Sequence, residues 1–212
     1  MSTIAEDVST GMNTIDAVYM RRAVKHFDST HRLTEAEERK LLEATIQAPT
    51  SFNIQHWRFV ILRDPELRAR IRKEFGNDQA QMTDASLLVL FTADVKAWQK
   101  HPERYWANAP QEVADLLVNW MGPFHEGREW LQRDEAQRSI GMAMQTMMLV
   151  AQEMGYQSCP MIGFDIDKVA ELVSLPDDHA MGPMVAIGKS IKDPWPKPGQ
   201  LPLEELVFEN TF

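Results

Sequence analysis

The chain has one cysteine, Cys159, among its 212 residues. A single thiol forms neither an internal disulfide nor a zinc site built from several cysteines, and this usage is typical of a reducing compartment. No apolar run approaches the roughly 20 residues that a membrane-spanning helix needs. The first residues are polar and acidic, unlike a signal peptide. The sequence therefore predicts a cytoplasmic protein with no membrane partner.

Basic charge is also scarce, with 22 Lys and Arg against 31 Asp and Glu and a formal net charge of −9. A nucleic-acid partner would require a basic surface, so none is expected. The six histidines form neither an i,i+4 pair nor an HExxH motif, so no metal site is predicted. GxSxG and GxGxxG are absent, which argues against a nucleophile elbow and a Rossmann fingerprint.

What remains is the composition of one ordinary globular domain, 44% apolar and 25% charged. Helical and strand-like patterns alternate, with five or six helices for three or four strands. This predicts a single α+β domain in which helices pack against a small central sheet. The expected helices begin near residue 13 and otherwise cover 34–47, 64–75, 111–121, 134–155 and 165–173; the expected strands cover 58–62, 86–92 and 182–188.

Four segments are expected to depart from these regular elements. Residues 1–12 are interpreted as a loose polar tail, and 158–164 as a tight loop. Residues 96–130 are irregular and rich in aromatic side chains, which predicts an insertion that is either a lid over a pocket or half of an oligomer interface. The apolar and acidic residues 201–212 cannot bury their leucines alone, so they should dock along the sheet or on a partner.

A polar turn between a helix and a strand, residues 48–62, is the most informative stretch. It carries Thr50, Ser51, Asn53 and Gln55. These residue types favour turns for local reasons, so a purely structural role is one interpretation. A ligand cradle is the other, and it is favoured because a turn requires neither the amide of Gln55 nor the indole of Trp57.

Three cations lie within five residues at Arg21, Arg22 and Lys25. Cations are favoured at the C-terminal end of a helix, so a solvated helix end would explain them. An anion such as phosphate would explain them equally well. Cys159 is interpreted as a buried inert thiol rather than a nucleophile.

Two of these stretches match one family. Residues 21–28, RRAVKHFD, resemble the Arg-Arg-Ser-x-Arg/Lys-x-Phe opening of the nitroreductase family of FMN flavoproteins. Residues 48–59 resemble its Ala-Pro-Ser-Ser-x-Asn-x-Gln-Pro-Trp-x-Phe segment. Residues 159–165 are similar to its Pro-x-x-Gly-Phe loop. The likeness extends over about residues 13–207.

The resemblance implies one domain over residues 1–212 with the nitroreductase-like three-layer sandwich, a small, mostly antiparallel sheet flanked by helices. It also implies an intertwined homodimer with FMN at the subunit interface and a C-terminal arm, residues 196–212, that wraps the partner. The matched positions depart from the family pattern at Ala23, where Ser is usual, His56, where Pro is usual, and Ile162, where many members have Glu.

The resemblance assigns the cofactor contacts residue by residue. Arg21 and Lys197 would hold the phosphate, with Arg22 and Ala23 beside them. Lys25 would approach the pyrimidine edge of the flavin, and Gln81 its ring carbonyls. Ile162 and Gly163 would lie over the reactive edge. The other subunit would supply the polar turn with Pro49, Thr50, Ser51, Asn53 and Gln55.

The activity implied is that of an FMN-dependent oxidoreductase that uses NAD(P)H to reduce nitroaromatic, quinone or similar planar acceptors by ping-pong hydride transfer, with no catalytic side chain. Two alternatives stay open. One is a specialised flavoenzyme of the same family that dehalogenates or oxidises one metabolite. The other is a non-catalytic flavin-binding module.

Overall fold

The computed structural model describes residues 11–212, so most of the polar tail predicted over 1–12 lies outside the described residues. Within that part no helix combines the length and apolarity needed to cross a membrane. The helices are α1 (Thr14–Met20), α2 (Glu35–Thr45), α3 (Pro65–Arg70, continued by a π-helical turn over Ile71–Phe75), α4 (Gln81–Asp84), α5 (Gln111–His125), α6 (Glu129–Glu153) and α7 (Ile166–Leu172). The strands are β1 (Trp57–Ile61), β2 (Leu87–Asp94), β3 (Gln157–Met161) and β4 (His179–Gly188).

The four strands form one sheet in the order β1-β2-β4-β3, and every neighbouring pair is antiparallel. Each residue of the central strand β2 is buried, as its continuous apolar run predicted. The pairing of β2 with β4 sets Asp94 opposite His179 at one end of the sheet. The predicted α+β class with a small antiparallel sheet is confirmed.

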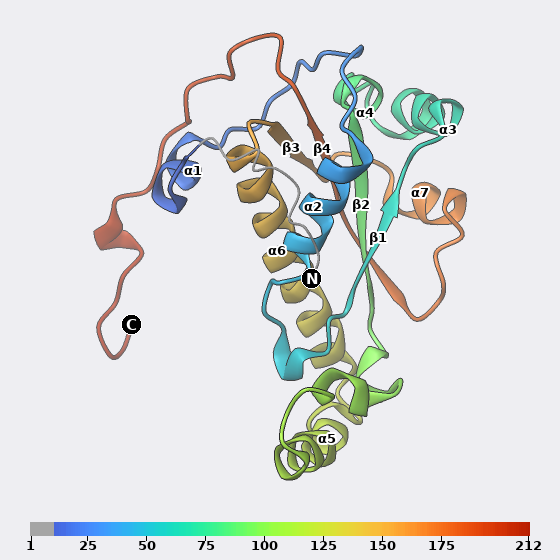
Figure 1. Cartoon of the computed structure of the whole chain (residues 1–212), viewed down its shortest axis with the longest axis vertical. Coiled ribbons are helices and arrows are strands. Elements are labelled where there is room, and N and C mark those ends of the chain that lie inside the picture. Colours follow the sequence, from blue (N-terminus) through green and yellow to red (C-terminus); the bar gives the residue numbers. More distant parts are fainter. Residues whose placement is uncertain (1–10) are drawn as a thin grey trace.

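Helices cover both faces of this sheet (Figure 1), which gives three layers. Successive residues of a strand point to opposite faces, so β2 contributes to two cores. Val89 and Phe91 pack with Ile140 and Met147 of α6 on one face. On the other face, Leu88 and Leu90 pack with residues of α3 and its π-helical continuation, α4 and α7, among them Ile71, Met82 and Val169.

Local signals set several helix ends where the sequence predicted them. Thr34 and Glu37 form the full capping box that begins α2. Asp64 caps α3 with Pro65 in its first turn, and Asp165 caps α7 through the Lys168 amide. Gly155 follows α6 with φ +76°, the left-handed conformation that ends helices.

Several predicted boundaries were wrong. Helix α6 begins at Glu129 rather than near Asp134, because Arg128 supplies no side-chain cap that would mark this start in the sequence, and β4 begins at His179 rather than Gly182.

Two further differences involve prolines. Residues 157–161, of which 158–161 were predicted to belong to a tight loop, form β3. A strand is possible here because β3 lies at the edge of the sheet, where Pro160, which has no backbone N–H, can face away from the neighbouring strand. Gly122-Pro123 does not end α5, which continues to His125. Pro123 lies in the last turn, where the amide of Glu126 still donates to the Gly122 carbonyl at 2.8 Å.

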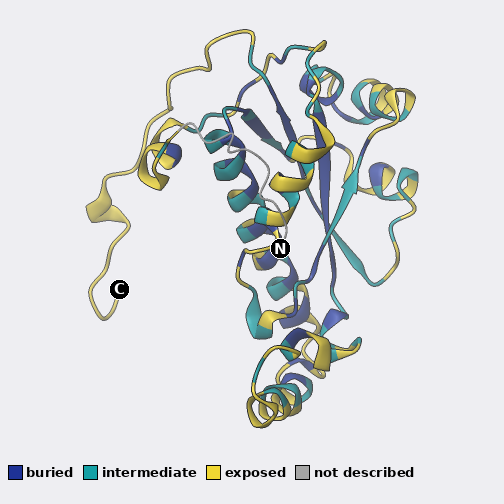
Figure 2. Cartoon of the chain, viewed as in Figure 1, coloured by how far each residue is buried: buried dark blue, intermediate teal, exposed yellow. Residues whose placement is uncertain are grey.

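Most residues of α1 and the whole C-terminal segment are exposed (Figure 2), and they include large apolar side chains. In α1 only Ala17 is buried, whereas Tyr19 is 71% exposed. Every residue from Ile191 to Phe212 is exposed, and this segment leaves the sheet and passes beyond α1 (Figure 1). The suggestion that residues 201–212 dock along their own sheet is therefore wrong for the single chain.

Candidate functional site

The segment after α1 carries the predicted cations. It runs beside β3, where the Val24 amide donates to the Ser158 carbonyl at 3.0 Å. This pairing sets the Lys25 ammonium 3.7 Å from the Cys159 Sγ. The Arg22 guanidinium donates instead to the carbonyls of Tyr19 and Arg21, at 2.6 and 2.9 Å. It therefore supplies hydrogen-bond partners for carbonyl groups at the C-terminal end of α1.

The thiol of Cys159 is fully buried, as predicted. Burial raises its pKa, although the positive charges of Lys25 and Arg21 act in the opposite direction. Gln81, only 4% exposed, reaches the same sulfur from α4, with its Nε2 3.9 Å from Sγ. Lys25 and Gln81 are therefore brought together, although 56 positions separate them in the sequence.

The turn after β3 completes this group. The Gly163 carbonyl accepts hydrogen bonds from Gln79 Nε2 at 2.8 Å and from Asn77 Nδ2 at 3.1 Å. Gln79 also accepts from Gln81 Nε2 at 3.1 Å, so it links the turn to the amide. Ile162 is 61% exposed at its edge. We call Lys25, Gln79, Gln81, Cys159 and Gly163 the Cys159 cluster.

A cavity of about 520 Å³ opens next to this cluster, between the segment after α1 and the start of the C-terminal segment. Arg22, Ala23 and Lys25 line one side, and Lys192 and Trp195 the other. Lys197 lies exposed between two lining prolines but is not itself part of the lining. Lys189 is committed elsewhere, since its ammonium donates to the Gly155 carbonyl at 2.8 Å.

Side chains of the polar turn that were predicted to bind the cofactor also form hydrogen bonds that stabilise the conformation of the turn. Thr50 Oγ1 accepts from the Gln55 amide at 3.0 Å, and Asn53 Nδ2 donates to the Tyr105 carbonyl at 2.8 Å. Phe52, Asn53 and Gln55 all have φ between 52° and 55°. This left-handed conformation costs about 1–2 kcal/mol per residue, and such strain is often retained at functional sites.

The turn packs on the irregular segment 96–130. The ring of Phe52 lies 5.2 Å from that of Phe124 and 5.8 Å from that of His125. Ile54 is buried in the same small core as Tyr105. The segment predicted as a lid or interface therefore supports the polar turn of its own chain.

One chain keeps the two halves of the predicted site apart. His56, which follows the turn, contacts Ser139 in the first half of α6. Helix α1 lies instead over the later part of α6, around Val150. These two positions of α6 are about 16 Å apart along the helix axis, and Figure 1 shows α1 and the turn beside different ends of α6. Arg21 and Lys25 therefore do not meet Thr50 and Asn53 within a single chain.

A family model described as the nitroreductase family matches residues 18–189. The chain belongs to the nitroreductase family. Protein DrgA of Synechocystis is 65% identical over 201 residues, covering 92% of this chain and 95% of DrgA. MhqN of Bacillus subtilis, provisionally named an NAD(P)H nitroreductase, is 30% identical over 175 residues, covering 80% of this chain and 84% of MhqN.

The fold comparison agrees with the family assignment. The structure superposes on a provisionally named nitroreductase of Exiguobacterium sibiricum, solved in complex with FMN, with a TM-score of 0.86. The two sequences are 24% identical, and the match covers 94% of this chain and 98% of the other. The resemblance inferred from residues 21–28 and 48–59 and the predicted nitroreductase-like sandwich are thus confirmed.

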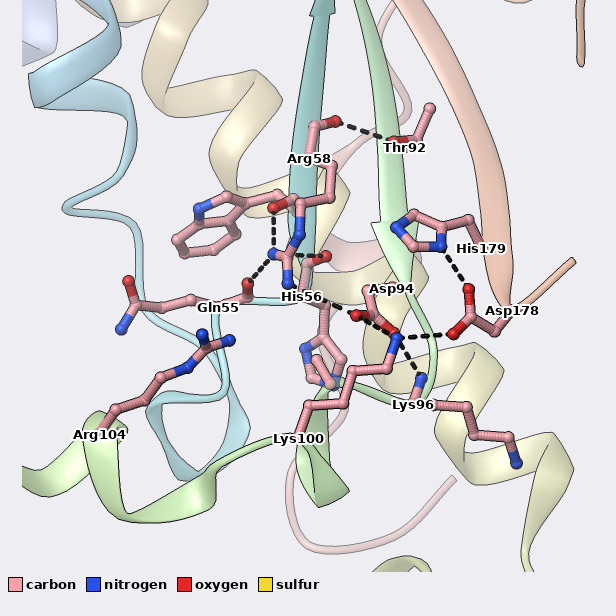
Figure 3. Close-up of polar contacts among 12 residues, drawn as sticks. Gln55, His56, Arg58, Thr92, Asp94, Lys96, Lys100, Arg104, Asp178 and His179 are labelled. Atoms are coloured by element: carbon pink, nitrogen blue, oxygen red, sulfur yellow. Dashed lines mark hydrogen bonds and ion pairs between the residues drawn. The ribbon is translucent and has the colours of Figure 1, made fainter. Parts of the chain in front are cut away.

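This nitroreductase-family chain also has a charged network that the sequence did not reveal (Figure 3). Asp94, 3% exposed, accepts from Lys100 Nζ at 2.8 Å and lies 3.5 Å from Arg58 Nη2. Lys100 also donates to Asp178 at 2.6 Å, and His179 Nδ1 lies 2.7 Å from the same carboxylate. Hydrogen bonds from Lys100 and His179 lower the pKa of Asp178 to about 2.

Asp94, Asp178 and His179 together offer three metal-ligand atoms within 4.8 Å of one another. The Lys100 ammonium already bridges the two carboxylates, so their negative charge is compensated by the protein itself. No sequence motif could have indicated the network, because 84 positions separate its two carboxylates. The register between β2 and β4 brings them together.

Proposed function

We propose that this protein is an FMN-dependent oxidoreductase that works as a homodimer and uses NADH or NADPH to reduce a planar acceptor such as a nitroaromatic or a quinone. The observation that carries the proposal is the Cys159 cluster, where an ammonium and a buried amide converge on a thiol. The FMN bound in the Exiguobacterium protein and the provisional name of MhqN support it.

The donors of the cluster fit a flavin ring. Within the described residues, the Lys25 ammonium donates only to the Cys159 sulfur. The buried amide of Gln81 has that sulfur and one side-chain oxygen of Gln79 as its partners. Sulfur is a weak acceptor, so both groups retain donor capacity that the carbonyl and nitrogen atoms of a flavin pyrimidine ring would satisfy.

The cavity beside the cluster offers room for the rest of the cofactor. Arg22 lines it, and Arg21 and Lys197 each adjoin a lining residue in the sequence. These three would hold the phosphate, which guanidinium and ammonium groups favour. Bound FMN supplies two-electron chemistry, taking a hydride from a reduced nicotinamide and passing two electrons to an acceptor. Lys25 would place a positive charge beside the ring, which stabilises added negative charge there. The exposed Ile162 would offer an apolar surface to a planar ring.

A second copy of the chain would complete the site. Its Thr50, Ser51 and Asn53 would approach the cofactor from the other side, since they cannot reach it within one chain. The same copy would cover the exposed apolar side chains of α1 and the C-terminal arm. The α5 face that bears Leu116 and Trp120, which are 47% and 56% exposed, would then act as the predicted lid.

The test begins with the purified full-length protein, which should be yellow and release FMN on denaturation. Gln81→Ala and Lys25→Ala should each lower the FMN content, because they remove donors to the ring. Lys168→Ala is a matched control, since Lys168 pairs with Glu171 on the surface of α7. A colourless protein that cannot be loaded with FMN refutes the proposal.

Turnover separates the general reductase from the specialised alternative. A broad reductase should reduce several nitroaromatics and quinones once NADH or NADPH has bleached the bound flavin. Slow turnover of the whole panel by a protein that is fully loaded with FMN would favour a specialist for one metabolite.

A further inference from the structure

An open pocket of about 490 Å³ lies between the end of the polar turn and the segment that carries Arg104 (Figure 3). We call it the arginine pocket. Its lining consists of Gln55, Trp57, Arg58, Arg104 and Tyr105. The cofactor contacts assigned above use Gln55 but leave the two arginines without a role.

Arg58 is held in a fixed position. Its Nη1 donates to the carbonyls of Gln55 and Trp57, at 3.0 and 2.8 Å, and its Nη2 lies 3.5 Å from Asp94. Its side chain is still 39% exposed. A guanidinium held in this way loses little conformational freedom when it binds a further group.

Arg104 contributes charge that is not neutralised. Its guanidinium lies 4.9 Å from the centre of the Tyr105 ring, and Nη2 donates to the Tyr105 hydroxyl at 3.0 Å. In the part of the chain that the structure describes, no carboxylate pairs with it. The neighbouring Glu103 lies 3.6 Å from His101 instead.

The surroundings of the pocket are positive in an otherwise acidic protein. Arg58 and Lys100 pair with the carboxylates of Asp94 and Asp178 (Figure 3), so these four charges balance. Arg104 lies outside this network and adds one positive charge at the pocket. The chain as a whole has a net charge of −9. A local surplus of this kind attracts anions to one place on the surface.

We propose that the arginine pocket binds the 2′-phosphate of NADPH and makes the protein prefer NADPH to NADH. This inference rests on the proposed function. The polar turn would contact the flavin, on which the nicotinamide must lie, and Gln55 belongs to both the turn and the pocket. The remaining, phosphate-bearing part of the dinucleotide would therefore extend past Gln55. Two guanidiniums match a phosphate, whereas a neutral quinone offers them no anionic group.

The test compares Arg104→Gln with Arg39→Gln, which removes the same charge from an exposed position on α2 where Arg39 pairs with Glu43. Loss of a charged hydrogen bond to phosphate should lower kcat/KM for NADPH about tenfold. The value for NADH should change less than twofold, and FMN content should not change. Arg104→Lys, which keeps the charge but loses the planar fork, should fall between the two.

Equilibrium binding of 2′,5′-ADP and 5′-AMP to the full chain supplies a readout that does not depend on turnover. The wild-type protein should bind 2′,5′-ADP more tightly than 5′-AMP, and Arg104→Gln should remove the difference. Equal losses for NADPH and NADH, or equal affinity of the wild-type protein for the two nucleotides, overturn the proposal. A protein that binds 2′,5′-ADP selectively but carries no FMN would refute the proposed function and leave the pocket assigned.

Discussion

Lowering the pH from 7 to 4 should destabilise the fold through the buried imidazole of His56. Its Nδ1 lies 3.0 Å from Ser139 Oγ, whose hydroxyl donates to the Glu135 carbonyl at 2.8 Å. Nδ1 therefore carries the proton and donates to Ser139. The other ring nitrogen, Nε2, is buried and has no hydrogen-bond partner among the described residues. Burial, together with the charges of His125 and Arg58, lowers the pKa of His56 to about 4.

The sign of the effect follows from proton binding. The unfolded chain takes up a proton on His56 near pH 6.5, whereas the folded chain takes it up only near pH 4. Between these values the unfolded state binds more protons, so the free energy of unfolding falls as the pH falls. The difference corresponds to about 3 kcal/mol, lost between roughly pH 6.5 and pH 4. At lower pH this contribution no longer changes.

The assay is urea unfolding followed by circular dichroism at several pH values and one fixed protein concentration. His56→Asn is the control, because its amide can still donate to Ser139 but does not titrate. The stability advantage of the wild-type protein over this variant should shrink by about 3 kcal/mol from pH 7 to pH 4. An advantage that is independent of pH, or an imidazole NMR signal of His56 that titrates near pH 6.5, would refute the reasoning.

Three further predictions concern other parts of the chain. Thr34→Ala removes the capping box of α2 and should lower the free energy of unfolding by about 1 kcal/mol in urea; an unchanged midpoint would show that Glu37 alone suffices. Cys159 should react with a thiol reagent at pH 8 far more slowly in the native protein than in urea, because burial raises its pKa; fast native labelling would contradict this. Tyr19→Asp places a charge on the exposed apolar face of α1 and should shift the protein from dimer to monomer in sedimentation velocity; an unshifted dimer would show that this face is not an interface.

The elements that the sequence predicted well are those whose signals are local. Capping residues such as Thr34 and Asp165 act within one helical turn, and the apolar run of β2 reports burial on both faces without reference to any partner. Pro160 and Pro123 misled the prediction for the opposite reason. Their tolerance depends on tertiary placement, at a sheet edge for Pro160 and in the last turn of a helix for Pro123, which the local sequence does not contain.

The candidate site shows the same division. The residue types of the polar turn and of Arg21 to Lys25 could be recognised in the sequence, since each group is contiguous. The contact of both Lys25 and Gln81 with the sulfur of Cys159 could not be recognised in the sequence. It depends on the position of β3, which carries Cys159. The charged network of Asp94 and Asp178 was missed altogether, because strand register alone makes them neighbours.

The exposed apolar side chains at the two ends of the described chain have a consequence for the life of the protein in the cell. Until another surface covers α1 and residues 191–212, their exposed apolar side chains can associate non-specifically with other macromolecules. In the proposed homodimer a second copy covers these side chains, so a newly made chain would stay exposed until it meets that copy, and slow synthesis would prolong this interval. Abundance in the cell should thus respond to the rate of synthesis more steeply than in proportion.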